Sequence, residues 1–367
     1  MGFHFREQSP RLSSAKILTN QGKRLTIKYN PQELGKDFSS VHEFSQRQDV
    51  EQAFPYLSRR RKVHLSKVGI QARNGETHDY LVLRQGRKRF LFDTVESQVP
   101  DAGISEDRRR KSLSLTLVVP QQVMREKGYM PQDNEGLRQF QSRRDSRTFF
   151  ATTEKEGYLA VRGTTDNPTS IENNTDFIQP IPAVVIQDPQ DNILFTVRGG
   201  DGANHDERLS GMITTPFTMG HSDPSDFGKW RSLLRYGLKH AMYREAGEET
   251  ALQKEQQTIH LFPPNKNGHG YNVTVRGILN VHRYYRIKPL GVVYKEDTPI
   301  DKVHAGVIFV AKPKRKNVTF VLNGASHEIH HVLPISQQDY QHVIDEKGLT
   351  PTSWDKPIMN AVFAKRR

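Results

Sequence analysis

Short segments in the first part of the chain alternate hydrophobic and polar positions, which is the pattern of half-buried β-strands. Residues 80–84 and 87–92 are two such segments, and Gly86 between them predicts a tight turn and therefore a β-hairpin. Further strands are expected where alternating hydrophobic residues follow each of two basic runs, 59–62 and 108–111. The front of the chain is therefore expected to be β-rich.

The later part of the chain mixes strand signals with helical spacing. Residues 181–186 and 193–197 are apolar segments on either side of the turn-forming segment 188–192, which predicts a second hairpin. Leu238 and Met242 belong to a set of hydrophobic residues at helical spacing, which predicts an amphipathic helix that runs into an acidic cluster.

The remaining hydrophobic segments complete a mixed pattern. Four of them are expected to be strands: 273–279, 290–294, 305–311 and 318–322. Two near the C-terminus are expected to be helices: 339–344 and 356–363. The predicted fold class is therefore α+β.

The chain is long enough to divide into domains. Its 367 residues exceed the length of about 250–300 at which one hydrophobic core stops growing. Residues 163–174 are polar, rich in turn-forming types and nearly free of hydrophobic residues, so they are the expected linker. We expect a domain of unknown fold at 1–165 and a second domain at 175–367.

Positive charge is concentrated in the front of the chain. Residues 1–150 carry a net charge of +11 and residues 151–367 carry +2. Such asymmetry is typical either of an anionic partner, most economically nucleic acid, or of a solvated basic face, and the sequence leaves both open. Three aromatic residues of the first hairpin could stack on bases, but their strand spacing favours the core: Tyr80, Phe90 and Phe92.

Composition excludes several classes of function. Because the chain has no cysteine, it has no disulfides, thiolate zinc site, iron–sulfur cluster or cysteine nucleophile. No stretch approaches about 18 consecutive apolar residues, and Arg6 and Glu7 stand where a secretory signal needs an apolar run. We therefore expect a cytoplasmic protein with no membrane association.

The acidic cluster at the end of the predicted helix is the strongest chemical signal. Glu245, Glu248 and Glu249 stand at i, i+3 and i+4, so a helix places their carboxylates on one face. Three like charges there call for a compensating cation, and oxygen ligands favour Mg²⁺ or Mn²⁺. Arg244 is close enough to orient a carboxylate. The alternative is an ordinary charged surface helix that ends at Gly247.

In this context the chain resembles the Nudix hydrolases, bacterial MutT-like and phosphoesterase-like members included, over about residues 175–367. Several residues match the Nudix box: Arg244, Glu245, Ala246, Glu248, Glu249 and Leu252. Three positions depart from it, because an ungapped count puts Trp230 at the leading glycine and Tyr236 at the outer glutamate, and Ala251 replaces the trailing glycine. A ten-residue insertion around 222–230 would instead make Gly220 the leading glycine, and we prefer it.

The resemblance implies an α/β/α sandwich with a mixed sheet that hydrolyses a diphosphate linkage in a nucleoside diphosphate derivative, using Mg²⁺ or Mn²⁺. It implies Glu245, Glu248 and Glu249 as metal ligands with Gly220 in the same site, and Arg244 as the residue that orients Glu245. The general base would come from a later loop, where the candidates are Glu296 and Glu328.

The departures from the box keep other interpretations open. One is a non-catalytic Nudix-fold module that binds a nucleotide or nucleic acid. Another is an enzyme that processes nucleic-acid ends, in which the basic front holds the polymer. A literal His-Glu-x-x-His at 327–331 would indicate a zinc peptidase, but the turn before it and Pro334 after it predict an extended segment instead of the helix it requires.

Overall fold

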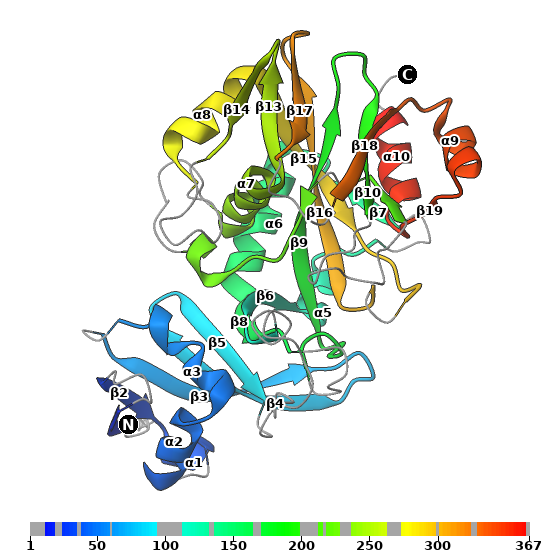
Figure 1. Cartoon of the computed structure of the whole chain (residues 1–367). Helices are drawn as coiled ribbons and strands as arrows, with labels where there is room; N and C mark the ends of the chain where they lie inside the picture. Colours follow the sequence, from blue (N-terminus) through cyan, green and yellow to red (C-terminus); the bar gives the residue numbers. More distant parts are fainter. Residues whose placement is uncertain are drawn as a thin grey trace, which may run out of the picture. The chain divides into compact units, whose positions relative to one another are not determined.

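The computed structural model describes most of the chain. The described residues are 12–18, 24–34, 38–58, 61–93, 112–131, 136–163, 170–198, 212–215, 218–227, 236–262, 273–298, 301–323 and 329–364. They form two compact units (Figure 1). The first unit comprises Met1–Leu115 and Tyr158–Asp176, and the second comprises Thr116–Gly157 and Phe177–Arg367.

The first unit is built around strands paired in the order β1-β2-β3-β4-β5-β8. These strands are β1 (Ser13–Leu18), β2 (Arg24–Tyr29), β3 (Val63–Gln71), β4 (Thr77–Gln85), β5 (Lys88–Asp93) and β8 (Tyr158–Val161). Short helical segments lie between β2 and β3: α1 (Pro31–Leu34), α2 (Phe38–Ser45), α3 (Gln48–Glu51) and η1 (Phe54–Tyr56). The β-rich prediction for the front of the chain is confirmed.

The first predicted hairpin is confirmed as β4 and β5, which pair antiparallel from Tyr80 opposite Asp93 to Gln85 opposite Lys88. Gly86 has a φ of 62°, a left-handed conformation that glycine adopts without strain. The aromatic residues of the hairpin, Tyr80, Phe90 and Phe92, are at most 4% exposed. They belong to the core, as their spacing predicted, and are not available to stack on bases.

The two units are not two consecutive stretches of the chain separated by a linker. Each unit instead consists of two separate segments of the sequence. Asp176 accepts hydrogen bonds from the Tyr80 hydroxyl at 2.7 Å and from His78 at 2.6 Å, and Arg162 pairs with the buried Glu172. These polar contacts fix residues 170–176 to the first unit, although their composition resembles a linker. Residues 116–157, which precede that segment, belong to the second unit.

The second unit is organised around β9 (Phe177–Gln187), in which every residue is buried. Strand β16 (His304–Pro313) pairs with β9 in parallel, and β15 (Tyr285–Val293) pairs with β16 antiparallel, so the sheet is mixed. The other strands of this sheet are β6 (Leu115–Pro120), β7 (Leu137–Gln139), β10 (Ile193–Arg198), β11 (Met212–Thr214), β12 (Thr218–Met219), β18 (Ile329–Ile335) and β19 (Thr350–Pro351). A separate three-stranded sheet contains β13 (Thr250–Lys254), β14 (Gln257–His260) and β17 (Val318–Leu322).

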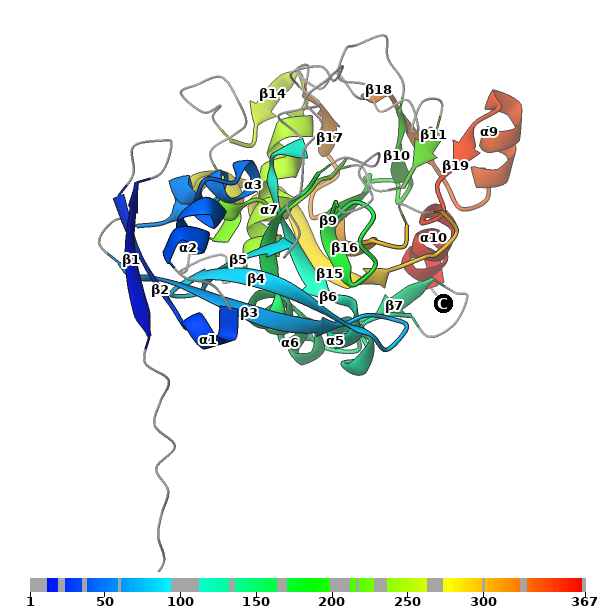
Figure 2. The same ribbon diagram turned by 90° about the horizontal axis from the view of Figure 1, so that it is seen from below.

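Helices cover both faces of the central strands of the second unit. In Figures 1 and 2, α7 (Gly237–Glu249) lies on one side of β9 and β16, and α10 (Asp355–Ala364) lies on the other. The remaining helical elements are α5 (Gln121–Glu126), α6 (Arg143–Glu156), η3 (Pro224–Phe227), α8 (Val275–Tyr284) and α9 (Tyr340–Lys347). The α+β prediction with a mixed sheet is confirmed. Within the described part of the chain, no helix has the length and apolar character needed to cross a bilayer.

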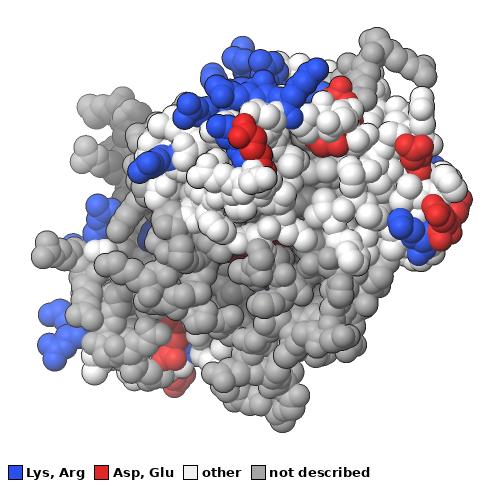
Figure 3. All heavy atoms as spheres, turned by 45° about the horizontal axis from the view of Figure 1, so that its top comes forward, with Lys and Arg blue, Asp and Glu red and all other residues white. Residues whose placement is uncertain are grey.

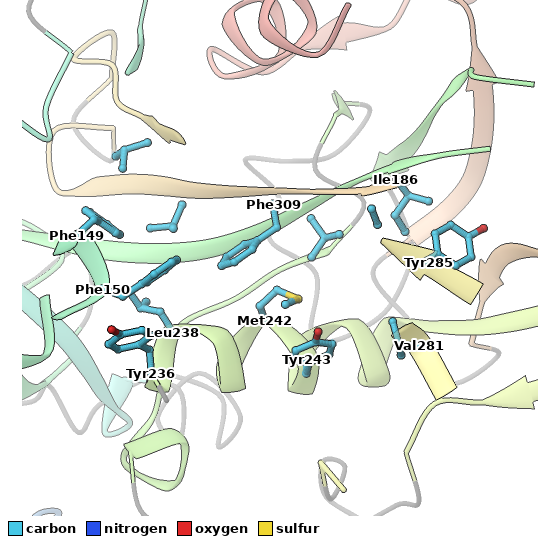
Figure 4. Packing of buried hydrophobic residues seen from close by; sticks show 14 of the residues in the cluster. Phe149, Phe150, Ile186, Tyr236, Leu238, Met242, Tyr243, Val281, Tyr285 and Phe309 are labelled. Atoms are coloured by element: carbon cyan, nitrogen blue, oxygen red, sulfur yellow. The ribbon is translucent and has the colours of Figure 1, made fainter. Parts of the chain in front are cut away.

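Two hydrophobic clusters fill the two spaces between helices and sheet. On the α7 side, Phe150 of α6 stacks on Phe309 of β16, with ring centroids 5.9 Å apart, and Met242 of α7 packs into the same cluster (Figure 4). On the α10 side, Ile308 of β16 packs with Ile358 in a second cluster. Adjacent residues of β16 thus face opposite layers, as strand geometry requires.

The strand predicted at 273–279 is wrong, because this segment enters helix α8. Thr274 caps the helix, since its hydroxyl accepts a hydrogen bond from the Gly277 amide at 3.1 Å. Ile278, Val281 and Tyr284 are buried at helical spacing. The segment opens with Val273, Thr274 and Val275, which are β-branched residues that favour a strand, and only the longer period indicates the helix. The other downstream strands and both C-terminal helices are confirmed.

The buried carboxylate of Asp355 predicts a pH-dependent stability. It accepts hydrogen bonds from the amide and hydroxyl of Thr215 and from the amide of Thr352, and burial raises its pKa to about 6 despite them. Because the folded protein keeps this proton to a higher pH than the unfolded chain, this group lowers the free energy of unfolding as the pH rises from about 4 to about 6, with no further change above. The free energy of unfolding can be measured by urea denaturation at about pH 4.5 and at about pH 7. It should fall more between these two pH values for the wild type than for Asp355→Asn. Equal pH dependence in the two proteins contradicts this assignment.

Candidate active site

Helix α7 carries the predicted acidic cluster in its last turns. Its N-terminal amide, on Gly237, donates a hydrogen bond of 2.6 Å to Glu154 of α6, and Leu238 and Met242 anchor one face in the core. The last turn contains no basic residue. Carboxylates there face the negative end of the helix dipole, which is unfavourable unless a positive group compensates. The helix itself therefore provides no positive charge to stabilise these carboxylates.

Gly220 lies directly against this helix. It follows β12, which pairs with β9, and its amide donates to the carbonyl of Pro182 at 3.4 Å. A Cβ atom at Gly220 would lie 2.1 Å from the carboxyl carbon of Glu245 and 2.3 Å from each of its oxygens. With the Glu245 carboxylate in this orientation, only glycine fits at position 220.

Arg244 connects the helix to the loop that follows Gly220. Its guanidinium donates to the Glu245 Oε1 atom at 2.6 Å and to the carbonyl of His221 at 2.7 Å. The nitrogen that contacts Glu245 also lies 3.7 Å from Glu248 Oε1. One guanidinium therefore holds two of the three predicted ligand carboxylates on the same side of α7.

The predicted insertion supplies a further carboxylate to Arg244. Asp226, in η3, has a fully buried side chain and lies 3.2 Å from the Arg244 guanidinium. It also accepts a hydrogen bond from His240 Nδ1 at 2.6 Å. Phe227, the next residue, packs where a Cβ of Gly237 would be. Segment η3 is thus docked along the face of α7 that carries His240 and Arg244.

Of the three departing positions of the box, Trp230 lies outside the described residues and the other two have structural roles. Tyr236 is 7% exposed and stacks on Phe150, with ring centroids 5.5 Å apart. A glutamate at this position would place a charge in an aromatic core, which is costly without a partner. Ala251 is fully buried in β13, where it pairs with Val321. The acidic partner of the arginine is therefore Asp226 of the inserted segment.

Crowding of carboxylates changes their acidity. Burial raises the pKa of Glu245 to about 7, although Arg244 opposes this effect. Burial also raises the pKa of Glu248, and the negative charges of Asp223 and Asp226 add to it. Near neutral pH the site therefore shares protons among its carboxylates. A cation would replace those protons.

The donor types suit a hard divalent cation, but among the described residues the structure does not bring these three carboxylates within ligand distance of one another. Glu245, Glu248 and Glu249 offer only carboxylate oxygens, which are the ligands that Mg²⁺ and Mn²⁺ prefer. The close approach of Gly220 to Glu245 leaves the backbone beside the carboxylate free of side-chain atoms. The raised pKa values have the sign expected of a site whose natural counter-charge is a cation.

Of the two candidate general bases, the structure describes Glu296 but not Glu328. Glu296 follows β15, forms an ion pair of 3.0 Å with Arg125 of α5 and accepts a hydrogen bond from the Tyr294 hydroxyl at 3.2 Å. Glu328 lies outside the described residues. The segment after it forms β18 from Ile329, which agrees with the extended conformation expected for the His-Glu-x-x-His sequence.

Sequence reasoning missed three residues that hold Arg244 in place: Asp223, Asp226 and His240. The position of His240 could have been predicted, because it precedes Arg244 by four residues and a helix places both on one face. The aspartates had none, since many polar residues of the loop could equally have approached the helix. Their position depends on how the loop folds back onto α7.

Comparisons with known proteins give only distant structural likeness. No known family profile matches this sequence, and no curated protein matches it. Tm1382, a protein provisionally described as a Nudix hydrolase, is similar over 68% of this chain and 99% of its own, with 16% identity and a TM-score of 0.40. A Nudix hydrolase from Alicyclobacillus acidocaldarius is similar over 51% of this chain and 91% of its own, with 14% identity and a TM-score of 0.31. At these values the likenesses assign the chain neither to a family nor to an activity.

The Asp226 contacts predict that Asp226→Asn destabilises the second unit. The substitution removes a buried charge that faces both Arg244 and His240, and breaking such a pair costs about 3 kcal/mol or more. Asp223→Asn is the matched control, because its carboxylate is 40% exposed and 3.6 Å from Arg244, where an ion pair contributes at most about 1 kcal/mol. Urea denaturation of both variants measures the difference. Equal losses of stability would show that Asp226 is not the main partner.

Proposed function

We propose that the second unit is a Nudix-type hydrolase that cleaves a diphosphate linkage in a nucleoside diphosphate derivative, with Mg²⁺ or Mn²⁺ as its cofactor. The observation that carries the proposal is the position of Arg244 between Asp226, Glu245 and the carbonyl of His221. The box lacks its outer acidic residue, yet the arginine still has a buried acidic partner and still contacts the glutamate that it would orient.

In this proposal the residues of α7 prepare the site before the substrate arrives. Glu245, Glu248 and Glu249 would hold the cation, and Gly220 would leave space beside them. When bound, the cation would neutralise charge on the diphosphate and lower the pKa of its bound water. Arg244 keeps Glu245 in one orientation, so that little reorganisation is needed on binding.

A carboxylate must also position or deprotonate the attacking water. Glu296 and Glu328 stay candidates for this role. The ion pair between Glu296 and Arg125 would have to open for Glu296 to act.

A non-catalytic binding module is the second candidate function. The replacement of the outer glutamate by Tyr236 and of the trailing glycine by Ala251 favours it. The retention of all three acidic residues on α7 opposes it. Hydrolysis and metal binding must therefore be measured separately.

Incubation of the purified protein with Mg²⁺ or Mn²⁺ and a substrate panel tests the activity. The panel contains nucleoside triphosphates, dinucleoside polyphosphates, ADP-ribose, NAD and RNA with a 5′-triphosphate. We expect cleavage at a diphosphate linkage, and we expect the double variant Glu248→Gln, Glu249→Gln to lose at least about 100-fold in rate. The control is Glu255→Gln, Glu346→Gln, which removes two exposed carboxylates and should keep full activity.

The outcomes separate the two candidate functions. Cleavage that the site variant loses and the control keeps supports the hydrolase. If nothing is cleaved but Mn²⁺ raises the melting temperature of the wild type alone, the site binds metal and the module interpretation replaces the enzyme. If metal has no effect either, both the cofactor and the activity are wrong.

The raised pKa of Glu245 predicts proton-coupled metal binding. Because protons compete with the cation for this carboxylate, the affinity for Mn²⁺ should fall as the pH drops below about 7 and should level off above it. Titration with Mn²⁺, followed by the electron paramagnetic resonance of the free ion, measures the affinity at each pH. An affinity that is constant across this range contradicts the role of Glu245 as a ligand.

A further inference from the structure

A basic groove lies at one end of β15 and β16 in the second unit. Arg286 and Lys288 of β15 and Lys312 of β16 line a pocket of about 330 Å³, and their side chains are exposed. The rest of its lining is apolar: Pro289, Leu290, Val310 and Val362. The pocket is at the lower end of the ligand-binding range, so it has room for a unit the size of one nucleotide.

The basic groove is on the face of the sheet opposite the candidate active site. Leu290 and Val310, which line it, belong to the hydrophobic cluster on the α10 side. Tyr285 and Ala311, their neighbours on the same strands, belong to the cluster on the α7 side. The groove is therefore separate from the carboxylates of α7, and its binding of a ligand does not depend on the proposed hydrolase activity.

The cations of the groove repel one another. Arg286 stands directly opposite Lys312 in the antiparallel register, and like charges in that position destabilise a sheet. Neither residues 275–295 nor residues 302–322 contain an aspartate or glutamate. In the part of the chain that the structure describes, the charged groups of the groove have no hydrogen bond or ion pair. An anionic ligand would remove this repulsion.

The neighbouring strand β9 offers polar groups but little counter-charge. Gln187 follows Ile186, which pairs with Ala311, so it lies beside the position of Lys312. It is fully buried, and its side-chain amide has no hydrogen-bond partner among the described residues. Asp188, the next residue, accepts hydrogen bonds from the amides of Gln190 and Asn192 in its own turn. Its carboxylate is thus occupied by the hydrogen bonds of its own turn.

Further cations of the second unit lie beside Tyr284, which belongs to the hydrophobic cluster on the α7 side. Arg283 and Arg315 lie over the ring of Tyr284, at 5.8 and 5.7 Å from its centroid, and Lys314 and Lys316 flank Arg315. Figure 3 shows Lys and Arg side chains crowded at the upper edge of the face that it draws. In the first unit, by contrast, several described cations are paired, such as Lys67 with Asp79 and Arg47 with Asp49. The cations of the groove itself are therefore Arg286, Lys288 and Lys312, which is more positive charge than a single phosphate requires.

We propose that the basic groove binds a single strand of nucleic acid, RNA or DNA, through its phosphate backbone. Arg286, Lys288 and Lys312 contact consecutive phosphates, and the apolar floor of the groove accommodates a base or sugar between them. Strand geometry spaces Arg286 and Lys288 by roughly 7 Å, which suits an extended polyanion.

Binding of a fluorescent oligonucleotide to the full-length protein tests the proposal. The probes are oligouridylate and oligothymidylate of about 20 nucleotides at about 50 mM salt. The groove variant is Arg286→Gln, Lys288→Gln, Lys312→Gln. The control is Lys127→Gln, Lys302→Gln, Lys347→Gln, which removes the same charge from exposed positions of the second unit.

We expect the groove variant to bind at least about tenfold more weakly and the control to stay within about twofold of the wild type. The slope of log affinity against log salt should become smaller by roughly 2 in the groove variant alone, because each lost phosphate contact contributes about 0.7. A preference between the two probes identifies the sugar that the groove accepts. The variant Lys288→Arg, Lys312→Arg keeps the charges and should retain binding.

Three outcomes overturn the proposal. Equal losses in the groove variant and the control would show that binding follows net charge alone. Competition by uridine monophosphate as effective as by the oligomer, at equal nucleotide concentration, would make the groove a small-anion site. Binding of vesicles that contain phosphatidylserine without binding of either oligomer would indicate a membrane surface. Misfolding does not obscure these results, because removal of the Arg286–Lys312 repulsion should leave the melting temperature equal or higher.

Discussion

The candidate active site depends on the guanidinium of Arg244. This group is the main positive charge described between four carboxylates, those of Asp223, Asp226, Glu245 and Glu248. It ties η3, the loop after Gly220 and the last turns of α7 to one point. Without it, the carboxylates of α7 would have to protonate or turn away from one another. The positions of these carboxylates are therefore determined largely by their attraction to Arg244.

The sheet of the second unit lets one scaffold carry two surfaces of opposite charge. Adjacent residues of β15 and β16 point to opposite faces, so one side packs against α6 and α7 and the other packs against α10. Carboxylates collect on α7, beyond the first face. Arginine and lysine collect at the end of the second face, at Arg286, Lys288 and Lys312. A sheet between them keeps these charges from neutralising one another.

Arg244 has a buried acidic partner even though the expected outer glutamate is absent. The position of the outer glutamate is occupied by Tyr236, which packs on Phe150 and helps to fix the start of α7. A carboxylate from a different part of the chain, Asp226, contacts the arginine instead. The inserted segment that obscures the motif in the sequence is thus the segment that supplies its missing acidic partner.

Local periodicity determined most of the fold. Alternating hydrophobic residues fixed the β4–β5 hairpin, and helical spacing fixed α7 with its acidic end. Two helices were not predicted from the sequence, because their local patterns of residues do not favour a helix throughout. Helix α8 is preceded by Val273 and Thr274, which are β-branched residues that favour a strand, and α6 is polar except for residues such as Phe149 and Phe150. Helix α6 nevertheless has a local start signal, because the Ser142 hydroxyl accepts a hydrogen bond from the Asp145 amide.

The sequence alone therefore determined that the three glutamates and Arg244 lie together at the end of one helix, because that geometry is local. Only the tertiary structure decided what surrounds them. Gly220 and Asp226 reach α7 through the packing of η3 and β12, and the basic groove exists because β15 and β16 pair in a particular register. Contacts between residues far apart in the chain depend on how the whole core closes, and no short pattern of residues encodes that.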